Sequence, residues 1–265
     1  MVKAKGFLFD ITRCSMCGAC WVADKERNGL PVPSGDFLAD KLSDKSFLVI
    51  KNLFGRGVRF SCMHCVSPTC VSVCPVAALE KTPIGAVIYH KDRCIGCRYC
   101  VVACPFDIPK YEWSKPLPYV RKCDFCYSRI MNGQMPACAA VCPTGALLYG
   151  DRDELLQEAR RRLNADPSKY VDHIYGEREV GGTSLLILSD IPMEKLGYPP
   201  SLSENPVPAL TWAALEEIPN VVLLGGALLG GLWWLTKRRA DVIRAEHSEM
   251  TAESVKNSEN GRDGQ

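Results

Sequence analysis

Short apolar runs alternate with cysteine-rich loops in the first half of this chain. Four of these runs predict β-strands, and they are Phe7–Phe9, Phe47–Ile50, Ala86–Tyr89 and Ala146–Tyr149. A helix is predicted from Asp151 to Leu163, because apolar residues recur there at helical spacing. The order of strand, cysteine loop, short helix and strand predicts an α+β fold, with residues 25–61 as an insertion.

The longest uncharged apolar stretch is Ile218–Thr236, which has 19 residues. As a helix it would be about 28 Å long, just enough to cross a bilayer. Trp233 and Trp234 at one end fit an interfacial belt, and Gly226 and Gly230 form a GxxxG motif that favours close approach of another helix. A buried core helix is the alternative, but such helices rarely lie between clusters of charge. We therefore predict one transmembrane helix at 218–236.

Flanking charges give this helix an orientation. Glu216 and Glu217 precede it, and three basic residues at 237–239 follow it. The positive-inside rule then places the C-terminus in the cytoplasm and residues 1–200 outside the cytoplasm.

Two further segments complete the predicted organisation. Residues 201–217 are a predicted linker. Residues 237–265 are predicted to be a disordered cytoplasmic tail, because they have little apolar content and no periodicity.

Composition and charge limit the function. The 265 residues include 32 Lys and Arg against 30 Asp and Glu, so the net charge is only +2 and no broad field exists to hold nucleic acid. Nucleic acid is therefore excluded as an expected partner. The 15 cysteines are an odd number and too small a share for a secreted disulfide scaffold, so they need another explanation.

The cysteines fall into four groups. The groups are Cys14-Cys17-Cys20, Cys62-Cys65-Cys70-Cys74, Cys94-Cys97-Cys100-Cys104 and Cys123-Cys126-Cys138-Cys142. The third group reads CIGCRYCVVACP, the spacing in which three thiolates hold one cubane cluster and the fourth, turned away, ligates the other cluster of a pair. The second and fourth groups keep the closing C-x3-C-P with wider gaps before it. The pattern predicts the two-cluster ferredoxin unit, duplicated; zinc and disulfides are the weaker alternatives.

The first group departs from this scheme at Asp24, which stands where the fourth cysteine is expected. By the crosswise rule, Asp24 points at the cluster of Cys123, Cys126 and Cys138, and Cys142 completes the first cluster. A carboxylate is a harder ligand than a thiolate, so the odd cluster is either a [4Fe–4S] cluster with an oxygen-bound, labile iron or a [3Fe–4S] cluster. A solvated acid at a helix N-terminus, with the cluster bound otherwise or absent, is the third possibility.

Other chemistry is not indicated. The sequence contains no P-loop, GxGxxG, nucleophile elbow or HExxH motif, so we expect no catalytic site in this chain. The basic run 160–162 is interpreted as a helix face. The four histidines, although His64 lies inside CMHC, are interpreted as residues that do not ligate metal; they are His64, His90, His173 and His247.

These motifs resemble the four-cluster iron–sulfur subunits of membrane-bound molybdenum or tungsten oxidoreductases and of uptake hydrogenases. The resemblance is strongest to the beta subunit of respiratory formate dehydrogenase. It covers the cysteine groups at 14–142, the segment His173–Pro199 and the single anchor that follows. It implies a non-catalytic electron-transfer subunit of anaerobic respiration. It also implies a catalytic partner with a pterin-bound metal or a nickel–iron site, and a membrane partner with cytochrome b or quinone chemistry.

Residue matching to this family completes the ligand sets. One pair of clusters is Cys14, Cys17, Cys20, Cys142 with Cys123, Cys126, Cys138, Asp24. The other pair is Cys62, Cys65, Cys70, Cys104 with Cys94, Cys97, Cys100, Cys74. The resemblance thus implies four iron–sulfur clusters, three of them [4Fe–4S], that relay electrons between the two partners.

Export of such a domain raises a conflict, because the first 14 residues have neither an apolar signal region nor a twin arginine. We expect export of the folded chain with a signal-bearing partner; a cytoplasmic domain with the opposite topology is the alternative. Two other function classes stay open at this point. They are a stand-alone, membrane-anchored ferredoxin and a zinc-binding scaffold protein.

Overall fold

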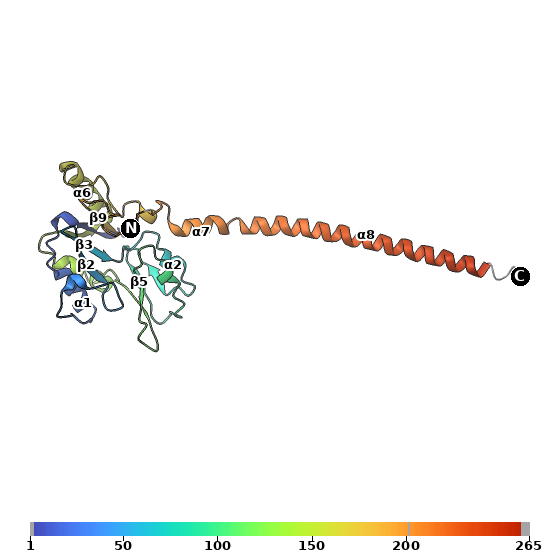
Figure 1. Ribbon diagram of the computed structural model, residues 1–265, viewed down its shortest axis with the longest axis horizontal. Helices are drawn as coiled ribbons and strands as arrows, with labels where there is room; N and C mark the ends of the chain where they lie inside the picture. The colour runs from blue at the N-terminus through green and yellow to red at the C-terminus, as the bar shows by residue number, and fades with distance from the viewer. Residues whose placement is uncertain (1–2, 201, 261–265) are drawn as a thin grey trace. The chain divides into compact units, whose positions relative to one another are not determined.

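The strand β1 lies at the centre of a three-stranded sheet in the order β8-β1-β9. It pairs antiparallel with β8 and parallel with β9, so segments distant in the sequence meet here. The structure is a computed structural model that describes residues 3–200 and 202–260. The chain divides into two units, Met1–Leu210 and Thr211–Gln265, and the first unit holds all the cysteines (Figure 1).

Mixed helix and strand confirm the expected α+β class of the first unit. Its strands are β1 (Lys5–Asp10), β2 (Leu48–Leu53), β3 (Arg56–Ser61), β4 (Leu79–Lys81), β5 (Val87–Tyr89), β6 (Lys110–Tyr111), β7 (Val120–Arg121), β8 (Leu147–Asp151) and β9 (Leu185–Leu188). Its α-helices are α1 (Ala19–Arg27), α2 (Thr69–Ser72), α3 (Tyr99–Val102), α4 (Tyr127–Met131), α5 (Ala137–Ala140) and α6 (Arg152–Ala165). Its short 3-10 helices are η1 (Ile11–Arg13), η2 (Phe37–Ala39) and η3 (Glu179–Gly181).

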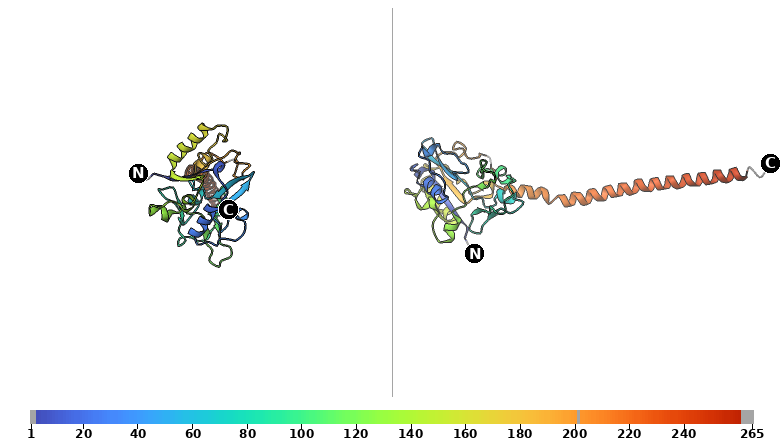
Figure 2. Two further views of the ribbon diagram at one scale, coloured as in Figure 1. Left: turned by 90° about the vertical axis from the view of Figure 1, so that its left-hand side faces the viewer. Right: turned by 90° about the horizontal axis from the view of Figure 1, so that it is seen from below.

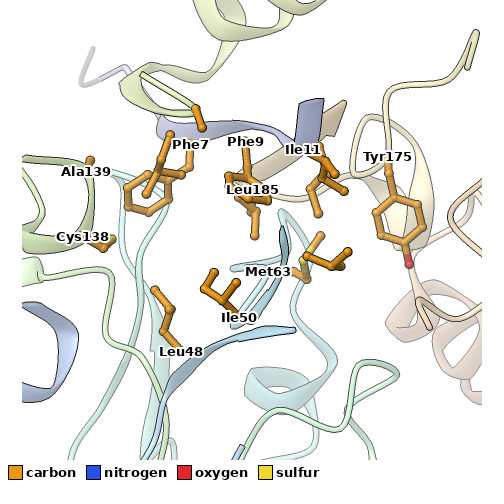
Figure 3. Packing of buried hydrophobic residues seen from close by; sticks show 14 of the residues in the cluster. Phe7, Phe9, Ile11, Leu48, Ile50, Met63, Cys138, Ala139, Tyr175 and Leu185 are labelled. Atoms are coloured by element: carbon orange, nitrogen blue, oxygen red, sulfur yellow. The ribbon is translucent and has the colours of Figure 1, made fainter. Parts of the chain in front are cut away.

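One face of the central sheet packs against the hairpin β2–β3. Successive side chains of a strand point to opposite faces, so Phe7 and Phe9 share this face. They belong to one buried cluster with Leu48 and Ile50 of the hairpin, and Figure 3 shows these side chains in the same core. The predicted insertion, 25–61, therefore contributes a hairpin to the core.

The other face of the sheet packs against α6, as the views in Figures 1 and 2 show. Leu8 of β1 and Leu186 of β9 form a second buried cluster with Leu155 and Ala159 of the helix. The predicted helix at 151–163 is thus present, shifted by one or two residues at its ends. Burying one such leucine contributes roughly 1.5–3 kcal/mol, so α6 is held mainly by this apolar stripe.

A buried ion pair also fixes α6 to the end of β1. Asp10 is fully buried and accepts hydrogen bonds from Arg162 Nη1 at 2.9 Å and from the Tyr170 hydroxyl at 2.9 Å. The neighbouring arginines, Arg160 and Arg161, pair with glutamates near the surface. The interpretation of the basic run 160–162 as a helix face agrees with the contacts of Arg160 and Arg161, whereas Arg162 is buried.

Two further helices follow, α7 (Val207–Leu215), which begins in the first unit, and α8 (Ile218–Asn260), which lies in the second unit. Within the described residues, one helical stretch, Val207–Met250, is long and apolar enough to cross a membrane, judged by length and composition. Pro219 lies in the first turn of α8, where a missing N–H is tolerated.

The predicted linker at 201–217 includes α7, with residue 201 outside the described residues, and its role as a linker stays a prediction. The predicted disordered tail is instead helical as far as Asn260, with 261–265 outside the described residues. The tail is rich in Ala, Glu, Lys and Arg, and a helix that is already nucleated extends through such residues at little cost.

Candidate metal centres

The four cysteine loops share one backbone feature. The residue two positions after the first cysteine of each group has a positive φ, and these residues are Met16 (54°), His64 (49°), Gly96 (73°) and Phe125 (67°). This conformation turns the backbone N–H back toward the sulfur, so Gly96 N donates to Cys94 Sγ at 3.4 Å and Phe125 N donates to Cys123 Sγ at 3.4 Å. The strained conformation costs about 1–2 kcal/mol at a residue other than glycine, so the rest of the fold must impose it.

The closing cysteines share a second feature. The residue three positions after Cys74, Cys104 and Cys142 also has a positive φ, and these residues are Ala77, Asp107 and Gly145. Backbone N–H groups beyond the turn donate to the sulfur, from Ala78 to Cys74 at 3.2 Å and from Leu147 to Cys142 at 3.4 Å. A proline after each closing cysteine ends the short helix.

The first group lacks this closing turn. No proline follows Asp24, and α1 continues through it to Arg27. The departure that the sequence shows at this position is therefore also a departure in backbone structure.

Three separate cavities are each lined by four cysteines from two groups. The first is lined by Cys14, Cys17, Cys20 and Cys142, the second by Cys62, Cys65, Cys70 and Cys104, and the third by Cys94, Cys97, Cys100 and Cys74. In each, the closing cysteine comes from a different group than the other three. The structure thus brings together three of the four expected sets in the crosswise arrangement.

The hairpin β2–β3 passes very close to the first cavity. A Cβ atom added to Gly57 would lie 2.7 Å from Cys14 Sγ and 2.6 Å from a side-chain carbon of Met16. Only glycine fits there without moving the cysteine loop, so the hairpin also shapes this site.

The remaining expected set consists of Cys123, Cys126, Cys138 and Asp24. Asp24 is close enough to Cys123 to interact with it electrostatically. Its side chain is 5% exposed, which excludes the solvated acid at a helix N-terminus that we had considered. Asn28 Nδ2 donates to Asp24 Oδ1 at 3.3 Å, whereas the buried Oδ2 has no hydrogen-bond partner among the described residues. Burial raises the pKa of Asp24 to about 6, against the opposing charges of Arg59 and Arg27.

Buried cations surround these sets, and sequence reasoning missed them. Arg59 on β3 is fully buried; burial lowers its pKa, but the thiols of Cys138 and Cys20 more than offset this, so its pKa is raised. Lys122 is 8% exposed and lines the cavity of Cys62. The sequence offered one clue to each of these cations: Arg59 is a charged residue within an apolar strand, and Lys122 directly precedes Cys123.

The cysteine environment fits iron–sulfur clusters. All fifteen cysteines are free, so the disulfide alternative is not supported. Burial raises the pKa of Cys20 and of Cys70 to about 12, so bare thiolates are unfavourable there until a metal supplies compensating charge. Among residues 3–200 and 202–260, no group of three or more His, Cys, Asp or Glu side chains is arranged to hold a single metal ion.

Three of the four histidines lie apart from the expected ligand sets, whereas His64 lies at one of them. A separate cavity also lies apart from these sets. His90 pairs with Glu80 at 2.9 Å and His173 with Glu179 at 2.6 Å, while His247 lies on α8. This separate cavity, with a volume of about 710 Å³, is lined by His173 and its neighbours and by none of the cysteines. His64 is 1% exposed and lines the cavity of Cys62; burial lowers its pKa well below the usual value.

Cysteine loops of this kind on a mixed helix and strand unit define a ferredoxin-like iron–sulfur protein. A family model described as a 4Fe-4S dicluster domain matches residues 58–152. A protein of Nitratidesulfovibrio vulgaris is 36% identical over 264 residues, which is 94% of this chain and 71% of that protein.

Two relatives carry informative names. Hydrogenase-2 operon protein HybA of Escherichia coli O157:H7 is 37% identical over 280 residues, or 88% of this chain and 84% of the relative. One chain of the anaerobic dimethyl sulfoxide reductase of Haemophilus influenzae is 38% identical over 156 residues, or 57% of this chain and 75% of the relative. The protein described here belongs to the family of 4Fe-4S dicluster proteins that includes these oxidoreductase chains.

Proposed function

We propose that this chain is the electron-transfer subunit of a membrane-bound oxidoreductase and holds four iron–sulfur clusters. The observation that carries the proposal is the set of three cavities, each lined by four cysteines from two groups. A bound cluster supplies an acceptor and donor of single electrons. The residues of the chain hold the clusters away from water, set the charge around them and determine their order.

Four ligand sets follow from this proposal. They are Cys14, Cys17, Cys20, Cys142; Cys123, Cys126, Cys138, Asp24; Cys62, Cys65, Cys70, Cys104; and Cys94, Cys97, Cys100, Cys74. The first two sets form one ferredoxin-like module and the last two form its duplicate. The positive φ that recurs two residues after the first cysteine of every group supports a duplication.

The order of the four sites is supported by electrostatic interactions between cysteines of different sets. Side chains of neighbouring sets interact electrostatically, and the pairs are Cys20 with Cys138, Cys123 with Cys62, and Cys70 with Cys100. These pairs support a single row that begins at the set containing Cys17 and ends at the set containing Cys97. Those two cysteines are the exposed ones, which supports passage of electrons to partners at the two ends of the row.

Asp24 is the proposed fourth ligand of the second site. Its Oδ2 is a buried acceptor without a partner in the protein, and a carboxylate oxygen in that state suits a metal ion. Oxygen ligation makes one iron labile, so this site holds either a complete [4Fe–4S] cluster or a [3Fe–4S] cluster. The other three sites hold [4Fe–4S] clusters.

The membrane arrangement rests on α8 and its flanking charges. The proposed span is 218–236, with Glu216 and Glu217 outside and the basic residues at 237–239 in the cytoplasm. The cluster unit then lies on the extracytoplasmic side, and the anchor contacts lipid and a membrane partner with cytochrome b or quinone chemistry.

The catalytic partner that we propose first is a hydrogenase subunit. The similarity to hydrogenase-2 operon protein HybA extends over 88% of this chain, whereas that to the dimethyl sulfoxide reductase relative extends over 57%. A molybdenum or tungsten subunit that oxidises formate, or that reduces sulfur compounds, is the second proposal. This order reverses the preference for formate that the sequence resemblance gave.

The test is to purify the complex from membranes in detergent without oxygen and to add hydrogen or formate in turn. We expect hydrogen to reduce the clusters, as read by EPR, and a quinone analogue to reoxidise them. Clusters that are reduced by none of hydrogen, formate and a reduced quinol, in a complex that keeps its subunits, would contradict the proposal. A protein that purifies alone as a stable monomer would favour the stand-alone ferredoxin instead.

A further inference from the structure

His64 is the second residue after Cys62, in the loop that the cysteine spacing alone would assign only to metal binding. It has a φ of 49°, the conformation that recurs in all four loops, and its side chain is 1% exposed. His64 is one of the residues that line the cavity of Cys62, Cys65, Cys70 and Cys104. His64 is thus built into the site without being one of its expected ligands.

The orientation of the His64 ring is fixed on two sides. The backbone N–H of Val87 donates to His64 Nδ1 at 2.9 Å. The ring also packs edge-on against Phe125, with centroids 4.7 Å apart and an interplanar angle of 64°. An Nδ1 atom that accepts a hydrogen bond carries no proton, so the proton of the neutral ring is on Nε2.

The Nε2–H of His64 is a donor that needs an acceptor. Nε2 is buried and has no hydrogen-bond partner among the described residues. Leaving a buried donor unpaired costs about 1–3 kcal/mol, so native structures normally supply an acceptor. No oxygen or nitrogen of the described residues fills that role here, and the cavity that His64 lines is the one expected to hold the sulfur atoms of a cluster.

We propose that His64 Nε2–H donates a hydrogen bond to a sulfur of the cluster held by Cys62, Cys65, Cys70 and Cys104. This inference rests on the proposed function, because it requires that cluster. The reduced cluster carries more negative charge than the oxidised one, so a hydrogen bond to sulfur stabilises the reduced form and raises the reduction potential.

The same tautomer excludes a different role. A histidine that binds iron through Nε2 must leave that nitrogen without a proton, whereas the Val87 contact assigns the proton to it. His64 is thus a positioning and tuning residue, and the four cysteines remain the ligands.

The direct test is pulsed EPR of the reduced, intact complex in which histidine is labelled with ¹⁵N. Among the four histidines, we expect a weak ¹⁵N coupling to one cluster that disappears in His64→Leu and persists in the matched control His90→Gln, whose ring pairs with Glu80 instead. His64→Gln supplies an amide N–H donor, so the reduction potential of this cluster should stay close to its wild-type value.

In His64→Leu we expect the equilibrium constant for reduction of that cluster to fall by about three- to tenfold, or roughly 30–60 mV at 59 mV per tenfold. Iron and sulfide analysis of each variant separates two failures. If the wild-type protein contains no iron–sulfur clusters, the proposed function is refuted. A full cluster content with no ¹⁵N coupling that depends on His64 would refute this inference alone, and the wild-type coupling decides it even if His64→Leu does not fold.

Discussion

Arg59 Nη2 donates to Cys138 Sγ at 3.6 Å in the interior of the cluster unit. The Arg59 side chain is 2% exposed, its Nε donates to the Ser61 hydroxyl at 3.1 Å, and its Nη1 has no partner in the part of the chain that the structure describes. Burying an arginine charge costs several kcal/mol unless negative groups compensate it. Thiolates of the first and second ligand sets are the compensating groups nearby, so Arg59 links the electrostatics of two proposed clusters.

Replacing Arg59 with Met should therefore lower the reduction potentials of the clusters at Cys14 and at Cys123. Removal of a positive charge disfavours the more negative reduced state, and we expect about a tenfold change in the equilibrium constant, or about 59 mV for one electron. An EPR redox titration measures this shift. Arg59→Lys is the matched control, because it keeps the charge. Potentials that do not move in a variant with full iron and sulfide content would contradict the prediction.

Substitution of Asp24 tests whether this residue is the fourth ligand of the cluster at Cys123, Cys126 and Cys138. With a chelator and mild oxidant, the wild-type protein should lose about one iron per chain and give a [3Fe–4S] EPR signal, because oxygen ligation leaves that iron labile. Asp24→Cys supplies a fourth thiolate and should retain the iron under the same treatment. Identical iron loss from the wild type and from Asp24→Cys would show that this residue does not bind the cluster.

The cysteine sets were accessible from the sequence because their spacing is local. Three thiolates on one loop and a closing C-P require no knowledge of the rest of the fold, and the sets assembled from them line three cavities. The four apolar runs likewise predicted β1, β2, β5 and β8.

Features that depend on distant partners were not predictable. The parallel pairing of β1 with β9 joins residues almost 180 positions apart, and no local pattern encodes it. Arg59 acquires its role only because the fold buries it beside Cys138. The helical tail was missed for another reason: its residues favour helix, but they lack the apolar stripe on which the prediction relied.

Replacing the closing cysteine of a group with alanine tests the crosswise ligand sets. Cys74→Ala should disturb the cluster of Cys94, Cys97 and Cys100, although it belongs to the second group. Cys104→Ala should disturb the cluster of Cys62, Cys65 and Cys70. Each change should remove or convert one cluster, seen as loss of one EPR component and of about a quarter of the iron at most. The crosswise assignment would be contradicted if each substitution removed the cluster of the group that contains the substituted cysteine, which is the cluster of Cys62 for Cys74→Ala and that of Cys94 for Cys104→Ala.

Asp10 should contribute to stability independently of the clusters. Asp10→Ala removes the carboxylate that pairs with buried Arg162 at 2.9 Å and leaves only Glu158, at 2.8 Å, to pair with it; breaking a buried pair costs about 3–5 kcal/mol. The melting temperature should fall by roughly 6–20 °C, as followed by circular dichroism. Arg178→Gln breaks only the exposed pair with Glu204 and should change it little. Equal effects of both substitutions would contradict the importance of the buried pair.

The most direct test of the central claim is a count of clusters in the intact anaerobic complex by Mössbauer spectroscopy, with iron and acid-labile sulfide analysis. The account predicts about 15–16 iron atoms per copy of this chain, beyond those of its partners, as three cysteine-ligated [4Fe–4S] clusters and one distinct cluster at Asp24. Zinc in place of iron, or only two clusters per chain, would contradict a relay of four.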